Sequence, residues 1–212
     1  MWELVKAGGW LMLPLVLCSI FTVAITIERF IRLKRTMILP KALLLNPAQN
    51  TDLVIQQLQQ NQALQNSTLG HIFMAGYQSK NQNEQFARAQ METTASQEIG
   101  YLEKNINFLG TLSAVAPLLG LLGTVLGIIE SFLVIDLGTN SNPTLMIPGI
   151  SKALITTAAG MFIAIPALFA YRYFQRLVQE YIAELEQQST LFHAALFYQN
   201  STAEEQEVRK AG

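Results

Sequence analysis

The sequence predicts an all-α membrane protein with three transmembrane helices, of which the second and third extend far into the cytoplasm. Half of the 212 residues are hydrophobic and only 14% are charged, against roughly 25% charged residues in an ordinary soluble domain. Three apolar runs are long enough to cross a bilayer. Lysine and arginine cluster after the first and third runs and are absent between the second and third. These three observations exclude a soluble globular protein.

The first apolar run, residues 9–27, contains no charged residue and is long enough for a hydrocarbon layer of about 30 Å. A signal peptide is the alternative interpretation. The run is longer than the usual hydrophobic core of such a peptide, and no small-residue cleavage site precedes Glu28 and Arg29. We therefore expect a retained membrane anchor. The single cysteine, Cys18, lies in this run, which excludes an intramolecular disulfide and favours a small packing residue over a redox group.

The second and third spans are expected at residues 108–135 and 150–171. Each contains a proline, Pro117 or Pro166, which buried transmembrane helices tolerate. The intervening turn, residues 136–148, is rich in glycine, asparagine, serine and proline, as a short external loop should be.

Basic residues predict the orientation. Because they concentrate on the cytoplasmic side of membrane proteins, the N-terminus and the turn at 136–148 are expected in the periplasm and the C-terminus in the cytoplasm. The predicted organisation is an outer N-terminus with the first helix at 1–31 and a cytoplasmic helical region at 32–106. The second and third helices with their periplasmic loop follow at 107–171, and a cytoplasmic C-terminal helix and tail at 172–212. The basic residues are Arg29, Arg32, Lys34 and Arg35 after the first span, and Arg172 and Arg176 after the third.

The regions outside the membrane are expected to be helical. Residues 84–109 contain no proline and only one glycine, Gly100. This predicts a helix that continues without a break into the second span, over residues 84–135 and a length of roughly 78 Å. The third span is expected to continue similarly through residues 172–197.

Several classes of function have no support in the sequence. The net charge of −1 indicates neither nucleic acid nor an acidic ligand. His71 and His193 are far apart without metal-ligand spacing, so no metal or other cofactor is expected. Neither a nucleotide-binding loop nor a nucleophile motif is present, and no internal repeat of the transporter type is visible. We therefore predict no catalytic residue and no enzyme activity.

Glu130 and Lys152 are lone charges in apolar spans. Each costs roughly 2.5–3.5 kcal/mol at the bilayer centre on insertion scales. Both lie roughly 6–8 Å inside the outer boundary, from the 1.5 Å rise per residue, so an ion pair between them, within or between subunits, is one hypothesis. In the alternatives, Lys152 extends alone to the outer surface, or Glu130 handles protons directly.

Small and hydroxyl-bearing residues follow a pattern on the second span. Gly123 and Gly127 form a face that allows close helix approach. Pro117, Thr124 and Ser131 recur at intervals of seven residues and share another stripe. The alternative for Thr124 is a hydrogen bond back to its own helix.

Five segments carry a family resemblance. They are WELVKAGGW at 2–10, ERF at 28–30, PLLGLLGTVLG at 117–127, GISKALITTAAG at 149–160 and AIPA at 164–167. Together they resemble the MotA/TolQ/ExbB proton-channel family, and most closely the short ExbB biopolymer-transport proteins, over almost the whole chain. The two glycine- and threonine-containing blocks in this order make the resemblance specific.

The resemblance implies a homopentameric subunit of the bacterial inner membrane. Its second and third helices would line a channel around the single span of an ExbD-like partner, and proton entry would drive a TonB-like protein. Channel-lining positions would be Thr124, Ser131, Thr156 and Thr157, and helix-packing positions would be Gly120, Gly123, Gly127 and Gly160.

The sequence departs from the family at one point. ExbB and TolQ proteins commonly carry a glutamate where this chain has Lys152, so the carboxylate that would assist protons there is absent. With Glu130 neutralised by a pair, the resemblance implies that the main titrating acid lies on the partner. A TolQ-like subunit of the Tol-Pal envelope-constriction system is the alternative. A MotA-like stator fits less well, because that branch has four spans.

Overall fold

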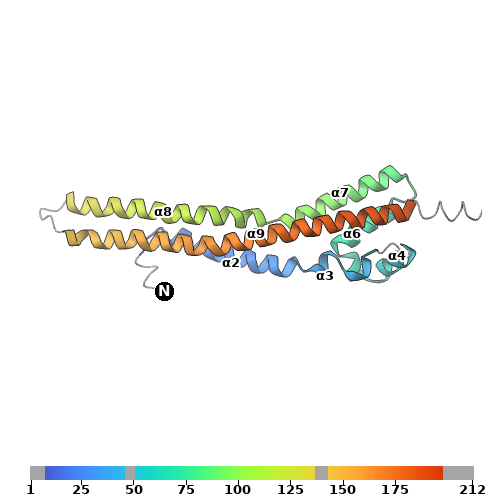
Figure 1. The fold of residues 1–212 in the computed structure, drawn as a ribbon, viewed down its shortest axis with the longest axis horizontal. Coiled ribbons are helices and arrows are strands. Elements are labelled where there is room, and N and C mark those ends of the chain that lie inside the picture. Colours follow the sequence, from blue (N-terminus) through green and yellow to red (C-terminus); the bar gives the residue numbers. More distant parts are fainter. Residues whose placement is uncertain (1–7, 46–50, 137–142, 198–212) are drawn as a thin grey trace, which may run out of the picture. The chain divides into compact units, whose positions relative to one another are not determined.

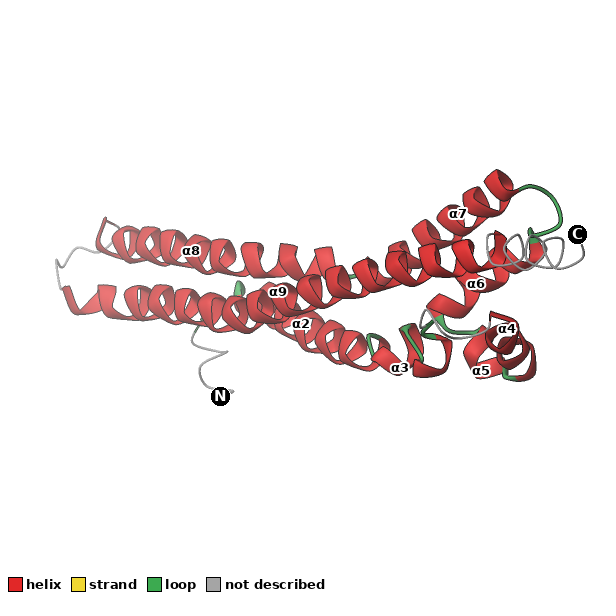
Figure 2. Ribbon diagram, turned by 45° about the vertical axis from the view of Figure 1, so that its right-hand side comes forward, coloured by secondary structure: helices red, strands yellow, loops and turns green. Residues whose placement is uncertain are grey.

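The computed structural model describes residues 8–45, 51–136 and 143–197, and over these residues the chain is helical with no strand (Figure 2). The long helices are α2 (Met12–Arg32), α7 (Glu84–Glu103), α8 (Ile106–Asp136) and α9 (Ile147–Phe197). The shorter ones are α3 (Arg35–Ile38), η1 (Lys41–Leu43), α4 (Thr51–Gln60), α5 (Gln62–Gln65), α6 (Thr68–Gln78) and η2 (Pro143–Met146). Three helical segments are long and apolar enough to span a membrane. The predicted fold class is confirmed.

The chain divides into two compact units. The first, called here the membrane unit, comprises Met1–Arg29 and Asn105–Gln175. The second, called the polar unit, comprises Phe30–Lys104 and Arg176–Gly212. The 51-residue helix α9 contributes to both, which agrees with the predicted continuation of the third span.

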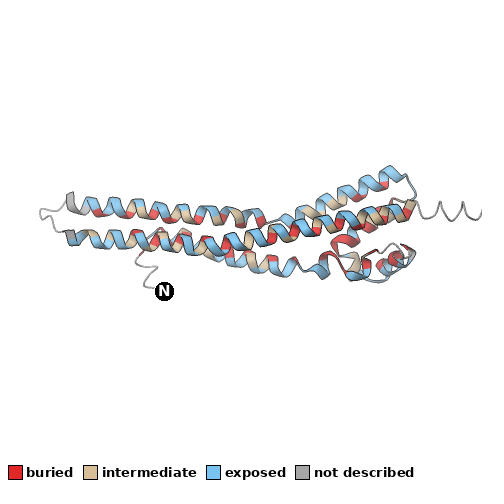
Figure 3. Ribbon diagram, in the orientation of Figure 1, coloured by how far each residue is buried: buried red, intermediate tan, exposed pale blue. Residues whose placement is uncertain are grey.

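In the membrane unit, α8 and α9 lie side by side (Figure 1). A small cluster of apolar side chains joins α2 to them, formed by Met12 and Leu15 of α2, Ala116 of α8 and Ala164 of α9. Phe21 also meets Phe108 edge to face, with 6.2 Å between the ring centroids. Many other positions on these helices are exposed (Figure 3), and large apolar side chains are frequent among them. Such a surface is suited to lipid or to other membrane helices.

The polar unit has a conventional core. Phe73 of α6 and Phe192 of α9 are fully buried and stack with 4.0 Å between ring centroids. Polar contacts join more distant segments: Tyr181 donates a hydrogen bond to the Leu33 carbonyl at 3.1 Å, and Gln188 accepts one from the Leu45 amide at 2.7 Å. Arg35 and Glu184 form an ion pair.

The prediction of an unbroken helix over residues 84–135 is wrong. Helix α7 ends at Glu103, Lys104 and Asn105 form a turn, and α8 begins at Ile106. Asn105 has a φ of +62°, which no residue of an α-helix adopts, and asparagine is one of the few residues other than glycine that adopt it at modest cost. The Asn105 carbonyl then accepts the first hydrogen bond of α8, from Leu109.

Candidate functional site

The polar residues of α8 and α9 meet in a seam between the two helices. The Thr124 and Thr157 hydroxyls are hydrogen-bonded to each other, and Thr157 also donates to the Gly120 carbonyl at 3.0 Å. Both threonines are half-buried. The Thr124 hydroxyl also lies 3.4 Å from the carbonyl oxygen of Gly120, four residues earlier on its own helix. Thr124 therefore makes both contacts: one back to α8 and one across to Thr157 of α9.

The other two predicted channel residues lie deeper in this seam. Thr156 donates to the Ala153 carbonyl at 2.9 Å and is 1% exposed. Ser131 donates to the Gly127 carbonyl at 2.8 Å and is 2% exposed. Because the chain itself covers both hydroxyls, Thr124 and Thr157 are the two of the four predicted channel residues that are partly exposed in a single copy.

Glycines allow this close approach. A Cβ atom on Gly160 would lie 2.6 Å from the Ala116 carbonyl oxygen, and one on Gly127 would lie 2.7 Å from the Gly149 oxygen. At Gly120 the Thr156 oxygen would be 3.0 Å away, and at Gly123 the Thr156 side chain occupies the same space. All four glycines of the predicted packing set face α8–α9 contacts, where a methyl group would meet backbone or a buried side chain.

Glu130 and Lys152 lie at one end of the same two helices. Lys152 Nζ is 2.7 Å from Glu130 Oε2 within one chain. The side chains are 29% exposed for Lys152 and 57% for Glu130, so this pair is at the surface of the membrane unit. The structure brings together the two charges that the sequence placed at equal depth.

Gly9 is a third part of this arrangement, and the sequence analysis did not single it out. Its φ is +73°, in the region that favours glycine. A Cβ on Gly9 would also contact the Lys152 stem and lie 3.0 Å from its Nζ. The backbone at Gly9 therefore passes close to the lysine of the ion pair. The positive φ is what favours glycine here, because the end of the lysine side chain could move away from a Cβ.

A polar cluster lies at the other end of α2. Arg29 is 2% exposed and lies 3.6 Å from Glu28 Oε1. Glu28 Oε2 accepts a hydrogen bond of 3.0 Å from the Asn105 side chain. Local sequence did not indicate this contact, because nothing in it connects two residues 77 positions apart.

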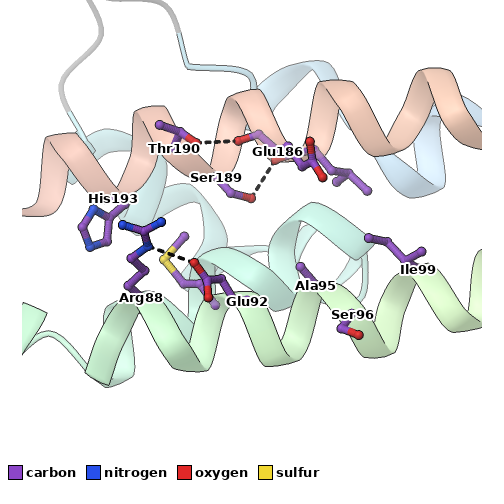
Figure 4. Close-up of a pocket in the computed structure, with 11 residues that line it drawn as sticks. Arg88, Glu92, Ala95, Ser96, Ile99, Glu186, Ser189, Thr190 and His193 are labelled. Atoms are coloured by element: carbon purple, nitrogen blue, oxygen red, sulfur yellow. Dashed lines mark hydrogen bonds and ion pairs between the residues drawn. The ribbon is translucent and has the colours of Figure 1, made fainter. Parts of the chain in front are cut away.

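The polar unit contains a hollow of about 570 Å³ between α7 and α9 (Figure 4). Its ionisable rim includes Arg88 and Glu92, which form an ion pair at 2.9 Å, and His193. The Ser189 and Thr190 hydroxyls are bonded back to carbonyls of α9. No cluster of three metal-ligating side chains occurs among the described residues.

These features define a class of protein: a helical, multi-pass membrane protein with a hydroxyl- and glycine-lined seam. The model of the MotA/TolQ/ExbB proton channel family matches residues 64–187, and the chain belongs to this family. Its predicted membership is thereby confirmed. The family is a channel type rather than an enzyme class, and with the three apolar helices it indicates a multi-pass protein of the inner membrane.

Relatives of both branches are similar to this chain. The ExbB-like 1 biopolymer transport protein of Synechocystis is 32% identical over 202 residues, which cover 91% of this chain and 78% of the relative. The Tol-Pal system protein TolQ of Haemophilus influenzae is 36% identical over 111 residues, covering 50% of this chain and 49% of the relative. ExbB of Salmonella typhimurium is 35% identical over 114 residues, covering 52% and 47%. The matches to these last two span about half the length of each relative.

Proposed function

We propose that this chain is an ExbB-like subunit of a motor driven by the proton-motive force. With an ExbD-like single-span protein, it would energise a TonB-like protein and, through it, transport across the outer membrane. The main support is the number and pairing of the carboxylates in the membrane helices. Away from the helix ends, Glu130 is the only carboxylate in the described membrane helices, and Lys152 pairs with it.

A proton carrier needs a carboxylate whose pKa can rise in a desolvated site. Glu130 is already paired with Lys152 of the same chain, so it is poorly suited to this task. The proposal therefore assigns the titrating acid to the span of the partner. Each proton that crosses about 100 mV releases about 2.3 kcal/mol, so several protons are needed for useful mechanical work.

The seam residues are assigned to the channel wall. Thr124 and Thr157, which are partly exposed in a single copy, would offer hydroxyls beside the partner's acid. Ser131 and Thr156, which are buried in a single copy, would stabilise the packing of α8 against α9 behind the channel wall. The oligomer proposed is a homopentamer, with its N-terminus in the periplasm and its C-terminus in the cytoplasm.

A TolQ-like role in the Tol-Pal envelope-constriction system is the second candidate. It is favoured by the similarity to TolQ of Haemophilus influenzae, at an identity close to that with ExbB of Salmonella typhimurium. Both candidates use the same channel and differ in the protein that they drive.

The test is co-expression of this chain with an ExbD-like single-span protein, or with the corresponding single-span protein of a Tol-Pal system. We expect a stable complex, five copies of this chain by native mass measurement, and proton flux only with the partner. Thr124→Val with Thr157→Val, which removes both hydroxyls and retains side-chain volume, should lower this flux while the complex still forms. Proton conduction by this chain alone would refute the assignment of the acid. A strain in which the gene for this chain is deleted separates the two candidates. Loss of iron-chelate uptake supports the ExbB-like role, and loss of envelope constriction supports the TolQ-like role.

A further inference from the structure

A second hollow lies in the membrane unit, between α2 and α9, away from the α8–α9 seam. It has a volume of about 280 Å³ and is lined by Ser19, Thr22 and Thr26 of α2 and by Phe162, Ile163 and Pro166 of α9. We propose that this hollow, called here the α2–α9 groove, binds one acyl chain of a membrane phospholipid. This inference rests on the membrane class of the protein and is independent of its motor function.

The lining of the groove is less polar than its sequence suggests. The Thr22 hydroxyl donates to the Cys18 carbonyl at 2.8 Å, and the Thr26 hydroxyl donates to the Thr22 carbonyl at 2.6 Å. Because both donors are used within α2, the threonines offer no free hydroxyl hydrogen to a ligand. A hydrocarbon chain therefore needs to displace no hydrogen bond there.

The depth of the groove matches one leaflet. Ser19 lies ten residues from Arg29, which is roughly 15 Å at the helical rise and half of a hydrocarbon core of about 30 Å. On α9, Pro166 lies six residues from Arg172, or roughly 9 Å. The groove thus extends from near the arginine-bearing boundary to the middle of the bilayer, which is the region that one acyl chain occupies.

The size of the groove favours an acyl chain over a second copy of this protein. An α-helix with its side chains is about 10–12 Å wide, so it would bridge a hollow of 280 Å³ and leave a void. Voids are costly because their lining atoms lose contacts. A flexible chain can fill the hollow, and the exposed side chains of Phe162, Val23 and Ile27 on its rim are apolar.

The experiment uses the full-length protein in phosphatidylethanolamine–phosphatidylglycerol vesicles that contain a phospholipid with a diazirine on one acyl chain. After illumination, peptides that carry lipid adducts are identified by mass spectrometry. We expect several-fold more adducts on the groove-lining residues of 19–27 and 162–166 than on exposed α2 positions outside the groove, such as Leu13 and Leu17. Equal labelling of all exposed faces would overturn the proposal.

A matched pair of variants tests the location. Ser19→Phe fills the groove, whereas Ala24→Phe adds a similar volume at an exposed position of α2 on another side of that helix. Ser19→Phe should lower the adducts at the groove several-fold, and Ala24→Phe should leave them unchanged. Thr26→Leu provides a second, smaller filling variant if Ser19→Phe fails to fold. A change in subunit number with Ser19→Phe or Thr26→Leu, without a loss of lipid adducts, would identify a second copy as the occupant and refute the proposal.

Discussion

The two units use the same secondary structure with opposite distributions of polar groups. In the membrane unit, hydroxyls of Thr156 and Ser131 are buried, while rings such as Phe162 are exposed. In the polar unit, Phe73 and Phe192 are buried, and charged pairs such as Arg88 with Glu92 are exposed. The difference follows from the medium: lipid is as apolar as the side chains, so close backbone packing and hydrogen bonds replace the hydrophobic effect between membrane helices.

The largest expected effect concerns the aromatic core of the polar unit. Phe192→Ala removes a fully buried ring that stacks on Phe73, and should lower the free energy of unfolding by about 3–5 kcal/mol. Phe169→Ala, at an exposed ring of the membrane unit outside the α2–α9 groove, is the control and should have little effect. Denaturant unfolding in detergent micelles, followed by circular dichroism, measures both. Equal losses of unfolding free energy would mean that an exposed ring of the membrane unit stabilises the chain as much as a buried ring of the polar unit.

The second prediction concerns backbone packing in the membrane unit. Gly160→Ala places a methyl group 2.6 Å from the Ala116 oxygen and 3.1 Å from the Gly120 Cα. Because backbone atoms on the opposite helix cannot rotate away, we expect α8 and α9 to separate, at a cost of about 1–3 kcal/mol. The same unfolding assay applies. An unchanged free energy of unfolding would mean that the seam has room for a side chain.

The third prediction concerns the turn before α8. Asn105→Ala keeps a side chain at a φ of +62° and removes the hydrogen bond to Glu28. Asn105→Gly removes the same hydrogen bond but accepts this φ without strain. We therefore expect the alanine variant to be less stable than the glycine variant by about 1–2 kcal/mol. If the two variants are equally stable, the chain does not need the left-handed conformation there.

The Asn105 turn also illustrates what the sequence could predict. Apolar length was sufficient for the number of spans, because polar groups are costly in lipid. The end of α7 carries no proline, and its one glycine, Gly100, lies inside the helix. The turn depends on an asparagine conformation supported from α2, which local sequence does not encode.

A similar limit applies to the candidate site. The spacing of Glu130 and Lys152 was sufficient to place both at one depth, since the helical rise is constant. It could not give their distance, which depends on how α8 and α9 are rotated. The contact of Gly9 with Lys152 joins residues more than 140 positions apart, so only the folded structure reveals it.

The fourth prediction tests this ion pair. Lys152→Met and Glu130→Gln each leave one polar group without its partner, whereas the double variant removes both charges. We expect the double variant to be more stable than the sum of the single effects implies, with a coupling energy of about 1 kcal/mol. Unfolding in lipid-containing micelles gives the stability, and native mass measurement gives the assembly. Additive effects would refute a stabilising role for the pair.

The smallest expected effect is a gain in stability. Gly100 lies within α7, is exposed, and has no heavy atom within 4 Å of the position of an added Cβ. Gly100→Ala should therefore stabilise the chain by about 0.5–1 kcal/mol, because alanine loses less backbone entropy in a helix. The sign is opposite to that of Gly160→Ala, although the chemical change is the same. Measuring Gly100→Ala both in dispersed chains and in the assembled protein sharpens this contrast. A gain in dispersed chains that becomes a loss on assembly would locate a neighbouring subunit at this face of α7, whereas a loss in both would contradict the open space around Gly100.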